Sequence, residues 1–442
     1  MLAHYTPLLR WSLALVRVAC LSGGRRSRKP RGPRPPPRVL QRVDGGVPEI
    51  ARCHPERYES LLAAKVASLE AAVAAAAGGA PLAAEVFESE RSGFRMRASF
   101  QVWREGSLDH GNQTRHLVMY ERGDDARNPV ECLDFPMGSD RLRSLLPPLT
   151  AALQGETLGY KINDARLLTT LAGDALLSLT YNRPLAGDEA WDAAAADFAA
   201  AHDVKVVGRS RKYKTAVGAD EVREVLDVPG RGTCAYWQTE GAFTQPNANV
   251  CRSMLGWAVA ATANRENGDL CELYCGNGCF TVALAPNFRR VVATELSKAS
   301  VALARRNLAA NGNDNARVAK LSAEEFVEAF DGARTFGRLL DAGVDLGNGN
   351  RTRAAAAATE ETLAFDALDT LFVDPPRAGL DATCVELARR FATVVYVSCN
   401  PETLARDVAL LAATHDVSRL AAFDQFPYTH HLEAGVVLER KS

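Results

Sequence analysis

Residues 269–278 read DLCELYCGNG, and this stretch decides the fold of the C-terminal half. Its first six residues are mostly apolar, as in a buried strand, and Gly276 and Gly278 then mark a tight turn into a helix. A second apolar strand, residues 290–295 (RVVATE), ends on Glu295. Strands that alternate with turns and helices predict an α/β fold with a mostly parallel sheet, helices on both faces and a ligand site at the carboxyl ends of the strands.

The glycine turn and the acid after it are typical of a nucleoside-binding site. Glycine lets the backbone approach a ligand closely, and a carboxylate about twenty residues later can accept hydrogen bonds from two ribose hydroxyls. A pyrophosphate-containing cofactor favours a third glycine, but Thr281 stands in that position. A nucleoside without a pyrophosphate fits this pattern better, and S-adenosylmethionine is such a ligand.

Two later apolar strands, residues 370–373 and 394–398, are each followed by a reactive side chain. Asp374 opens the stretch DPPRAGL, and Cys399 opens CNPETL. Asp374 either faces the ligand cleft or simply ends its strand in a turn. Cys399 is either a core thiol or a nucleophile, and a helix that begins after Asn-Pro would favour its thiolate.

Metal and disulfide chemistry are less well supported by the sequence. His430, His431 and Glu433 could bind a metal, but adjacent histidines point apart on an extended chain, so we expect no metal site. The three cysteines within residues 271–279 have neither a usual zinc spacing nor a radical-cluster spacing. Ten cysteines without paired spacings do not predict a disulfide framework, which favours a reducing compartment.

The N-terminal half has a different pattern of apolar and polar residues. Short alternating runs between residues 85 and 240, such as 94–103 (FRMRASFQVW), predict half-buried strands of an antiparallel α+β region. Within it, residues 208–214 (GRSRKYK) either contact phosphates and bases or form a solvated hairpin.

The first 48 residues resemble a targeting leader. Residues 1–43 carry ten of the 52 Lys and Arg residues and no Asp or Glu. The rest of the chain has 42 basic residues against 53 acidic ones and is therefore acidic. An RNA-binding surface must then be a local basic patch. The apolar run 8–21 is short and interrupted by Arg10 and Arg17, so we expect no membrane span. We expect a transit peptide for a plastid or mitochondrion. The alternatives are a basic tail or a misassigned start codon, and in either case we would expect a cytoplasmic protein.

Five motifs occur in the order found in the RNA 5-methyluridine methyltransferases, and the chain resembles that family from about residue 58 to its C-terminus. The C-terminal motif and residues 94–98 resemble its TrmA-type branch, which acts on the T-loop uridine of tRNA. The five motifs are FTQPN (243–247), ELYCGNG (272–278), FVDPPR (372–377), SCNPETL (398–404) and DQFPYTHHLE (424–433).

This resemblance implies a class I, Rossmann-like S-adenosylmethionine methyltransferase domain over residues 241–442, preceded by an α+β RNA-binding domain over 49–240 and the leader 1–48. It implies that Cys399 is the nucleophile and Glu433 the general base, that the partner is the T-arm of tRNA and not DNA, and that the protein is monomeric. The implied cofactor contacts are Gln245, Tyr274, Gly276, Glu295 and Asp374.

These residue types suit the chemistry that the resemblance implies. Carbon 5 of uracil becomes nucleophilic once a thiolate adds to carbon 6, and a carboxylate then removes the carbon 5 proton before the cysteine leaves. A uridine stacked in a loop must first be flipped out.

Two departures from the family pattern and two rival functions remain. Cys279 replaces an asparagine of the bacterial enzymes, and residues 341–366 resemble an insertion. An RNA cytosine-5 methyltransferase is one rival, although it would carry a cysteine where Arg377 stands. A tRNA-folding chaperone with incidental methylation is the other.

Overall fold

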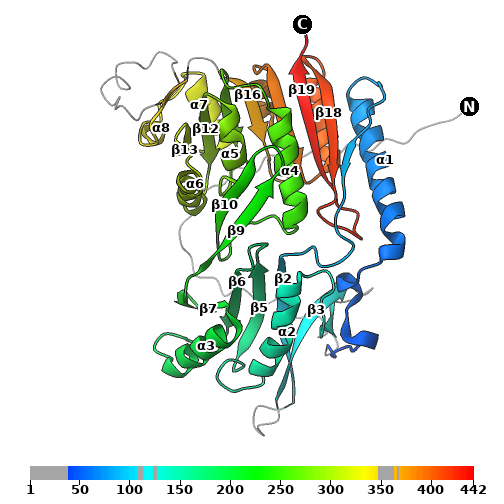
Figure 1. Ribbon diagram of the computed structural model, residues 1–442, viewed down its shortest axis with the longest axis vertical. Helices are drawn as coiled ribbons and strands as arrows, with labels where there is room; N and C mark the ends of the chain where they lie inside the picture. The colour runs from blue at the N-terminus through cyan, green and yellow to red at the C-terminus, as the bar shows by residue number, and fades with distance from the viewer. Residues whose placement is uncertain (1–37, 107–112, 123–126, 347–362, 366–367) are drawn as a thin grey trace, which may run out of the picture. The chain divides into compact units, whose positions relative to one another are not determined.

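An eight-stranded sheet forms the centre of the C-terminal half (Figure 1). Its order is β1-β18-β19-β17-β16-β11-β12-β13, and β11, β12, β13, β16 and β17 run parallel to one another. β19 runs antiparallel between β17 and β18. The strands are β11 (Asp269–Leu273), β12 (Arg290–Glu295), β13 (Ala316–Lys320), β16 (Leu368–Val373), β17 (Thr393–Ser398), β18 (His415–Phe423) and β19 (Glu433–Arg440).

The computed structural model describes most of the chain. The described residues are 38–106, 113–122, 127–346, 363–365 and 368–442.

Helices cover both faces of this sheet because its central strands are apolar on both sides. In β16, Phe372 packs into one core, while its neighbours Leu371 and Val373 pack into the other. This is the packing expected of a buried parallel strand, and it confirms the α/β fold expected from the sequence. One core holds α4 (Ala248–Ala261), α5 (Cys279–Leu284) and α6 (Lys298–Ala310); the other holds α1 (Tyr58–Ala76), α7 (Ala323–Phe330), α10 (Ala382–Ala388) and α11 (Pro401–Leu411).

The segment that precedes the second sheet packs with the C-terminal sheet. β1 (Glu85–Phe87) pairs in parallel with β18, and Lys65 of α1 forms a buried ion pair with Asp424. The Lys65 ammonium also donates a hydrogen bond to the carbonyl of His431 at 3.2 Å. The domain boundary expected at residue 240 stays a prediction, but these elements lie with the sheet that follows it.

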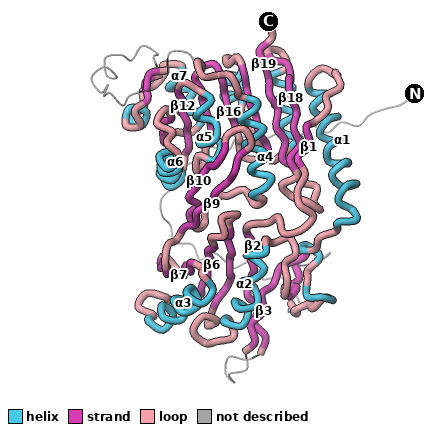
Figure 2. Tube along the Cα trace, viewed as in Figure 1, coloured by secondary structure: helices cyan, strands magenta, loops and turns pink. Residues whose placement is uncertain are grey.

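A second, seven-stranded sheet occupies the N-terminal half in the order β4-β3-β2-β5-β6-β7-β8 (Figure 2). It is antiparallel except for β6 and β7, which are parallel and are joined through α3. α2 and α3 pack on one face of it. The elements are β2 (Arg97–Glu105), β3 (Thr114–Arg122), β4 (Arg127–Glu131), α2 (Asp140–Ala152), β5 (Ile162–Thr169), β6 (Ala175–Tyr181), α3 (Glu189–His202), β7 (Lys205–Ser210) and β8 (Tyr213–Val217).

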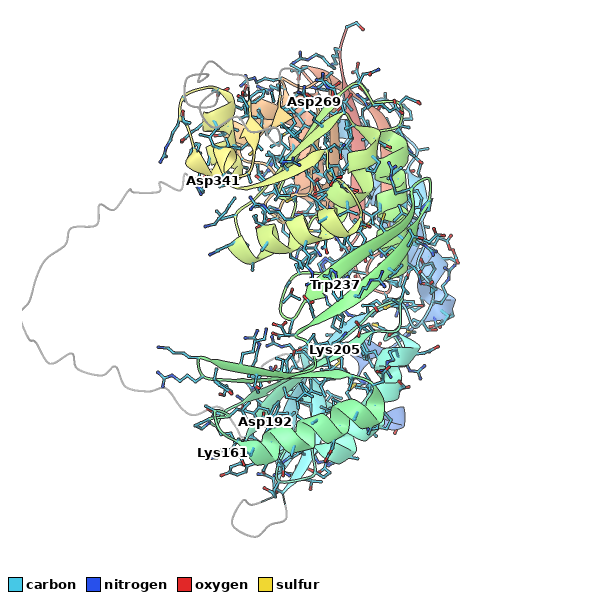
Figure 3. The ribbon with its side chains drawn as sticks, turned by 60° about the vertical axis from the view of Figure 1, so that its left-hand side comes forward. Lys161, Asp192, Lys205, Trp237, Asp269 and Asp341 are labelled. Carbon is cyan, nitrogen blue, oxygen red and sulfur yellow. The ribbon has the colours of Figure 1, made fainter. Side chains whose placement is uncertain are left out.

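A hairpin of β9 (Glu221–Val228) and β10 (Gly232–Thr239) packs against α6 of the C-terminal half. The backbone N–H of Trp237, labelled in Figure 3, donates to the side chain of Asn307 at 2.8 Å, and the guanidinium of Arg306 lies 4.1 Å from the Trp237 ring centroid. The basic stretch 208–214 forms the turn between β7 and β8, where Arg209 is bound by the carboxylate of Glu240.

Two features expected from the sequence fall largely outside the described residues. Residues 1–37 of the leader and residues 347–362 and 366–367 at the insertion are among those not described. Within the described part of the chain, no helix has the length and apolar character needed to cross a membrane.

Asn247 connects three segments beneath the C-terminal sheet. Its side-chain oxygen caps α4 by accepting from the Val250 N–H at 3.1 Å, and its amide donates to the Ser89 hydroxyl at 2.7 Å. Its backbone N–H donates to the side chain of Gln425 at 3.1 Å. Asn247 is fully buried, so each of these polar groups depends on its protein partner.

We predict that Asn247→Ala lowers the free energy of unfolding by about 2–3 kcal/mol, because the helix cap is lost and the Ser89 hydroxyl is left without this partner. Urea titration followed by circular dichroism measures this. Asn249→Ala is the matched control, since Asn249 bonds only a more exposed carboxylate, that of Glu90, and its loss should cost less than about 0.5 kcal/mol. Equal effects of the two substitutions would contradict the proposed anchoring.

Candidate active site

Three neighbouring strand ends bring together the reactive residues expected from the sequence. Asp374 follows the last residue of β16, Cys399 follows that of β17, and Glu433 begins β19. β17 and β19 are antiparallel, and Ser398 pairs with Ala434. The next step of this register places Cys399 beside Glu433, so the two lie close although they are far apart in the sequence.

These residues line one cavity of about 420 Å³, called cavity A here. Its wall combines the glycine turn after β11, the strand ends of the C-terminal sheet and the segment before α4. Gln245 accepts a long hydrogen bond of 3.4 Å from Gln425, and the Tyr274 hydroxyl lies 3.4 Å from the Cys384 thiol. Of the residues expected at the site, the cavity is lined by Gln245, Tyr274, Gly276, Asp374, Cys399 and Glu433.

Glu295, the remaining expected cofactor contact, lies behind the glycine turn and does not line cavity A. Its carboxylate accepts from the backbone N–H of Gly276 at 3.2 Å and from that of Ser297 at 2.7 Å. Gly276 has a positive φ of 56° with open space where a Cβ would stand. Gly278 is needed for another reason, because a Cβ there would lie 3.2 Å from Ala304 of α6.

The carboxyl groups of cavity A have strongly raised pKa values. Burial raises the pKa of Asp374 to about 7. Burial, helped by the nearby Asp374, raises the pKa of Glu433 to about 8, while the Arg377 cation opposes this shift. Each shift means that the charged carboxylate is poorly stabilised by the protein alone.

Glu272 is a site residue that the sequence reasoning did not single out. It lies in β11, is 1% exposed and lines cavity A. Burial raises its pKa to about 8, and one of its carboxyl oxygens has no hydrogen-bond partner among the described residues. The available signal was an acid in the middle of an otherwise apolar strand, where a charge is costly.

Cys399 is a half-buried thiol whose environment opposes ionisation. Burial and the nearby Glu433 and Asp374 raise its pKa to about 11, and Arg377 lowers it only in part. The following helix was expected to favour the thiolate; that contribution stays a prediction, but the net shift of the thiol pKa is upward. The side chain of Asn400 already caps that helix by accepting from the Glu402 N–H at 3.2 Å, and two carboxyl groups face the sulfur.

A second cavity of about 580 Å³, called cavity B here, shares Cys399 and Arg377 with cavity A. It is lined by α1, by the start of α11 and by residues 428–432. The backbone carbonyl of Arg377 accepts from the side chains of Asn400 at 3.1 Å and Thr403 at 3.3 Å, which fixes this loop beside Cys399. Cys399 therefore lies on a wall that both cavities share.

The sequence predicts that the two adjacent histidines before β19 point apart, but in the structure they lie together. Their ring centroids lie 3.9 Å apart, because these residues lie in the loop before β19 and not on an extended strand. Among the described residues, no three His, Cys, Asp or Glu side chains are grouped as metal ligands would be. Cys271, Cys275 and Cys279 form no such group either; instead the Cys279 sulfur lies 3.8 Å from that of Cys251.

The polar groups of cavity A suit a ligand that carries positive charge. Glu272, Asp374 and Glu433 line it, and burial raises their pKa values, so a cationic ligand would stabilise their charged forms. Cys399 supplies a soft nucleophile at the edge of the cavity, and Glu433 a group that can accept a proton near neutral pH.

Comparisons with known proteins identify the family of this chain. The model of the family described as tRNA (Uracil-5-)-methyltransferase matches residues 57–441. The tRNA/tmRNA (uracil-C(5))-methyltransferase of Azotobacter vinelandii is 49% identical over 387 residues, covering 88% of this chain and 98% of the relative. The enzyme of the same name from Pseudomonas aeruginosa is 48% identical over the same shares of the two chains.

The fold has a solved counterpart as well. The Pyrococcus abyssi tRNA (uracil-54, C5)-methyltransferase, solved in complex with S-adenosyl-L-homocysteine, superposes with a TM-score of 0.61 at 20% identity, covering 86% of this chain and 83% of that chain. This likeness confirms the fold class. The family match and the close relatives span nearly all of the described residues, and the chain belongs to the tRNA (uracil-5-)-methyltransferase family.

Proposed function

We propose that this protein transfers the methyl group of S-adenosylmethionine to carbon 5 of a T-loop uridine of tRNA, with Cys399 as covalent nucleophile and Glu433 as general base. The uridine is the one numbered 54 in the name of the Pyrococcus relative. The position of Cys399 on the wall shared by cavities A and B carries the proposal, because a uracil bonded to this sulfur from cavity B would lie next to a methyl donor in cavity A.

Cavity A fits S-adenosylmethionine by charge and by shape. This cofactor supplies a methyl group on a positively charged sulfonium. The buried carboxyl group of Glu272 and the partly buried one of Asp374 are available to a cation, and Gly276 leaves open space at the turn. Gln245 and Tyr274 complete the polar wall. Glu295 acts on the cofactor at least through the turn, since its carboxylate holds the Gly276 N–H.

Cavity B fits the flipped uracil. It opens beside Cys399 between α1 and residues 428–432, and its polar lining includes Arg377, His430 and Lys65. A base that leaves the T-loop stack costs a few kcal/mol of lost stacking, which contacts in such a pocket would offset. We propose the T-arm of tRNA, and not DNA, as the partner of a monomeric enzyme.

The residues then act in a fixed order. The Cys399 thiolate forms a bond to carbon 6 of uracil, and the electron pair of the 5,6 double bond moves into the ring carbonyl as an enolate. Carbon 5 of the enolate would then take the methyl group from the sulfonium of the cofactor, with the sulfur–methyl bond breaking to leave S-adenosylhomocysteine. The Glu433 carboxylate removes the remaining proton from carbon 5, the double bond re-forms and the bond to sulfur breaks. Arg377, the cation that lowers the pKa of Cys399, stabilises the thiolate before addition and after release.

We predict that Asp374→Asn weakens binding of S-adenosylmethionine more than binding of S-adenosylhomocysteine, because only the former carries the sulfonium charge. The expected difference is about tenfold, or about 1.4 kcal/mol. Isothermal titration calorimetry with both ligands measures it, and the ratio of the two affinities cancels any general damage to the cavity. An unchanged ratio would refute the electrostatic role of Asp374.

The sharpest test of the mechanism is Glu433→Gln, which keeps the shape of the side chain but cannot accept the proton. Addition and methyl transfer should still occur, and the methylated ring should stay bonded to Cys399, because elimination requires the proton to leave first. A protein–RNA adduct that carries labelled methyl and survives denaturing electrophoresis should therefore accumulate.

The control is Cys399→Ala, alone and combined with Glu433→Gln. We expect neither protein to form the adduct, and the single variant to bind tRNA while transferring no methyl group, because binding rests on phosphate and base contacts elsewhere. Normal turnover by Glu433→Gln, or a stalled reaction without methylated adduct, would assign the base to another residue. Turnover by Cys399→Ala would remove the covalent mechanism.

We also propose that residues 1–48 address the protein to a plastid or mitochondrion, on the strength of ten basic and no acidic residues up to position 43. A fluorescent protein fused behind residues 1–48 should enter an organelle, and the same fusion with Arg10 and Arg17 changed to Glu should not. A diffuse cytoplasmic signal from the first fusion would refute the assignment.

A further inference from the structure

Cavity A holds a close pair of thiols that the proposed reaction does not use. Cys251 lies in the first turns of α4, and Cys279 is the first residue of α5. Their sulfur atoms are 3.8 Å apart and hydrogen-bonded, and both residues line the cavity. The other cysteine on this wall that bears on function, Cys399, stands at the strand ends of the sheet.

We propose that Cys251 and Cys279 are a modification site, at which a small peroxide converts the two thiols into a disulfide that blocks the cofactor cavity. A disulfide has a sulfur–sulfur bond of about 2.05 Å, so the two atoms must approach by about 1.8 Å. Both are terminal side-chain atoms already in contact, and Cys279 directly follows a glycine turn whose Gly276 and Gly278 have positive φ angles.

The chemistry balances with hydrogen peroxide as oxidant. The Cys279 sulfur attacks one peroxide oxygen, the O–O bond breaks, and a sulfenic acid and one water form. The Cys251 sulfur then displaces the sulfenic oxygen as a second water and closes the disulfide. Two thiols are oxidised, one peroxide is reduced, and the two thiol protons leave in the two waters.

Access to the two thiols limits the size of the oxidant, and their reactivity limits the rate of the reaction. Cys251 is 4% exposed and faces the cavity, so a small molecule can reach the pair but a redox protein cannot enter. The hydrogen bond to Cys251 and burial raise the pKa of Cys279, which keeps the thiolate scarce and the reaction slow at neutral pH.

Formation of the Cys251–Cys279 disulfide would weaken binding of the cofactor in cavity A. α5 begins at Cys279, immediately after the Gly276–Gly278 turn, so a covalent link to α4 pulls on the backbone that forms the wall of cavity A. This consequence rests on the proposed cofactor site, whereas formation of the disulfide does not.

The first test uses Cys399→Ala protein, so that the nucleophile cannot be the thiol that reacts. After treatment with hydrogen peroxide and blocking of free thiols under denaturing conditions, the protein should carry two fewer blocking groups than unoxidised protein blocked in the same way, and its mass should be lower by these two groups and two hydrogen atoms. A cross-linked peptide should join Cys251 to Cys279. Adding Cys251→Ser or Cys279→Ser should abolish this peptide. Adding Cys234→Ser, which removes a buried thiol of the adjacent hairpin, should leave it in place. A cross-link that joins another pair, or oxidation to sulfinic acid without any cross-link, would overturn the proposal.

The second test measures binding of S-adenosylhomocysteine by calorimetry to the same protein before oxidation, after oxidation and after dithiothreitol. Affinity should fall severalfold on oxidation and recover on reduction, and the Cys251→Ser protein should show no such cycle. A disulfide that forms without changing affinity would overturn the blocking role. If the reduced protein binds no S-adenosylhomocysteine at all, the assignment of cavity A as the cofactor site is wrong. The cross-linked peptide then still shows whether the disulfide forms.

Discussion

The antiparallel pairing of β19 with β17 is the constraint on which the active site depends. The rest of the sheet could hold a nucleoside with parallel strands alone, but Cys399 and Glu433 meet only because β19 inserts between β17 and β18 in the opposite direction. A strand shifted by one residue would turn every side chain to the other face. The apolar residues of β19, buried from Ala434 to Leu438, therefore fix the position of Glu433 beside Cys399 as well as the core.

This geometry carries an electrostatic cost. Four carboxyl groups, of which those of Glu224, Glu272 and Glu433 are buried and that of Asp374 is partly buried, line one cavity with the Cys399 thiol. In the free protein each has a pKa above its ordinary value. Neutralisation by a cationic ligand would relieve the strain, so the cofactor would both deliver the methyl group and complete the charge balance of the cavity. The same raised pKa suits Glu433 as a base, because a carboxylate that accepts a proton near pH 8 is a far stronger base than an ordinary one. The burial that disfavours the charged Glu433 carboxylate is thus also what would make it an effective base.

The sequence predicted the strands of the C-terminal half well, because their apolar runs and glycine turns are local signals. It also placed Asp374 and Cys399 at strand ends, where local pattern and fold class together fix position. It could not place α1 and β1 against this sheet, since the partner of β1 lies more than three hundred residues later in β18. It misjudged the ionisation of Cys399 because that depends on Glu433 and Asp374, which only the folded chain brings near. The histidine pair and the Cys251–Cys279 contact were missed for the same reason.

Glu295 illustrates how a residue predicted to bind a ligand can also have a structural role that the sequence does not reveal. The sequence suggested a carboxylate that receives two ribose hydroxyls, whereas in the folded chain both of its oxygens already accept backbone N–H groups, from Gly276 and Ser297. A carboxylate has about four acceptor sites, so two remain for a ligand. The bond from the Gly276 N–H holds the turn in its positive-φ conformation, so Glu295 shapes the wall of cavity A although it does not itself line the cavity.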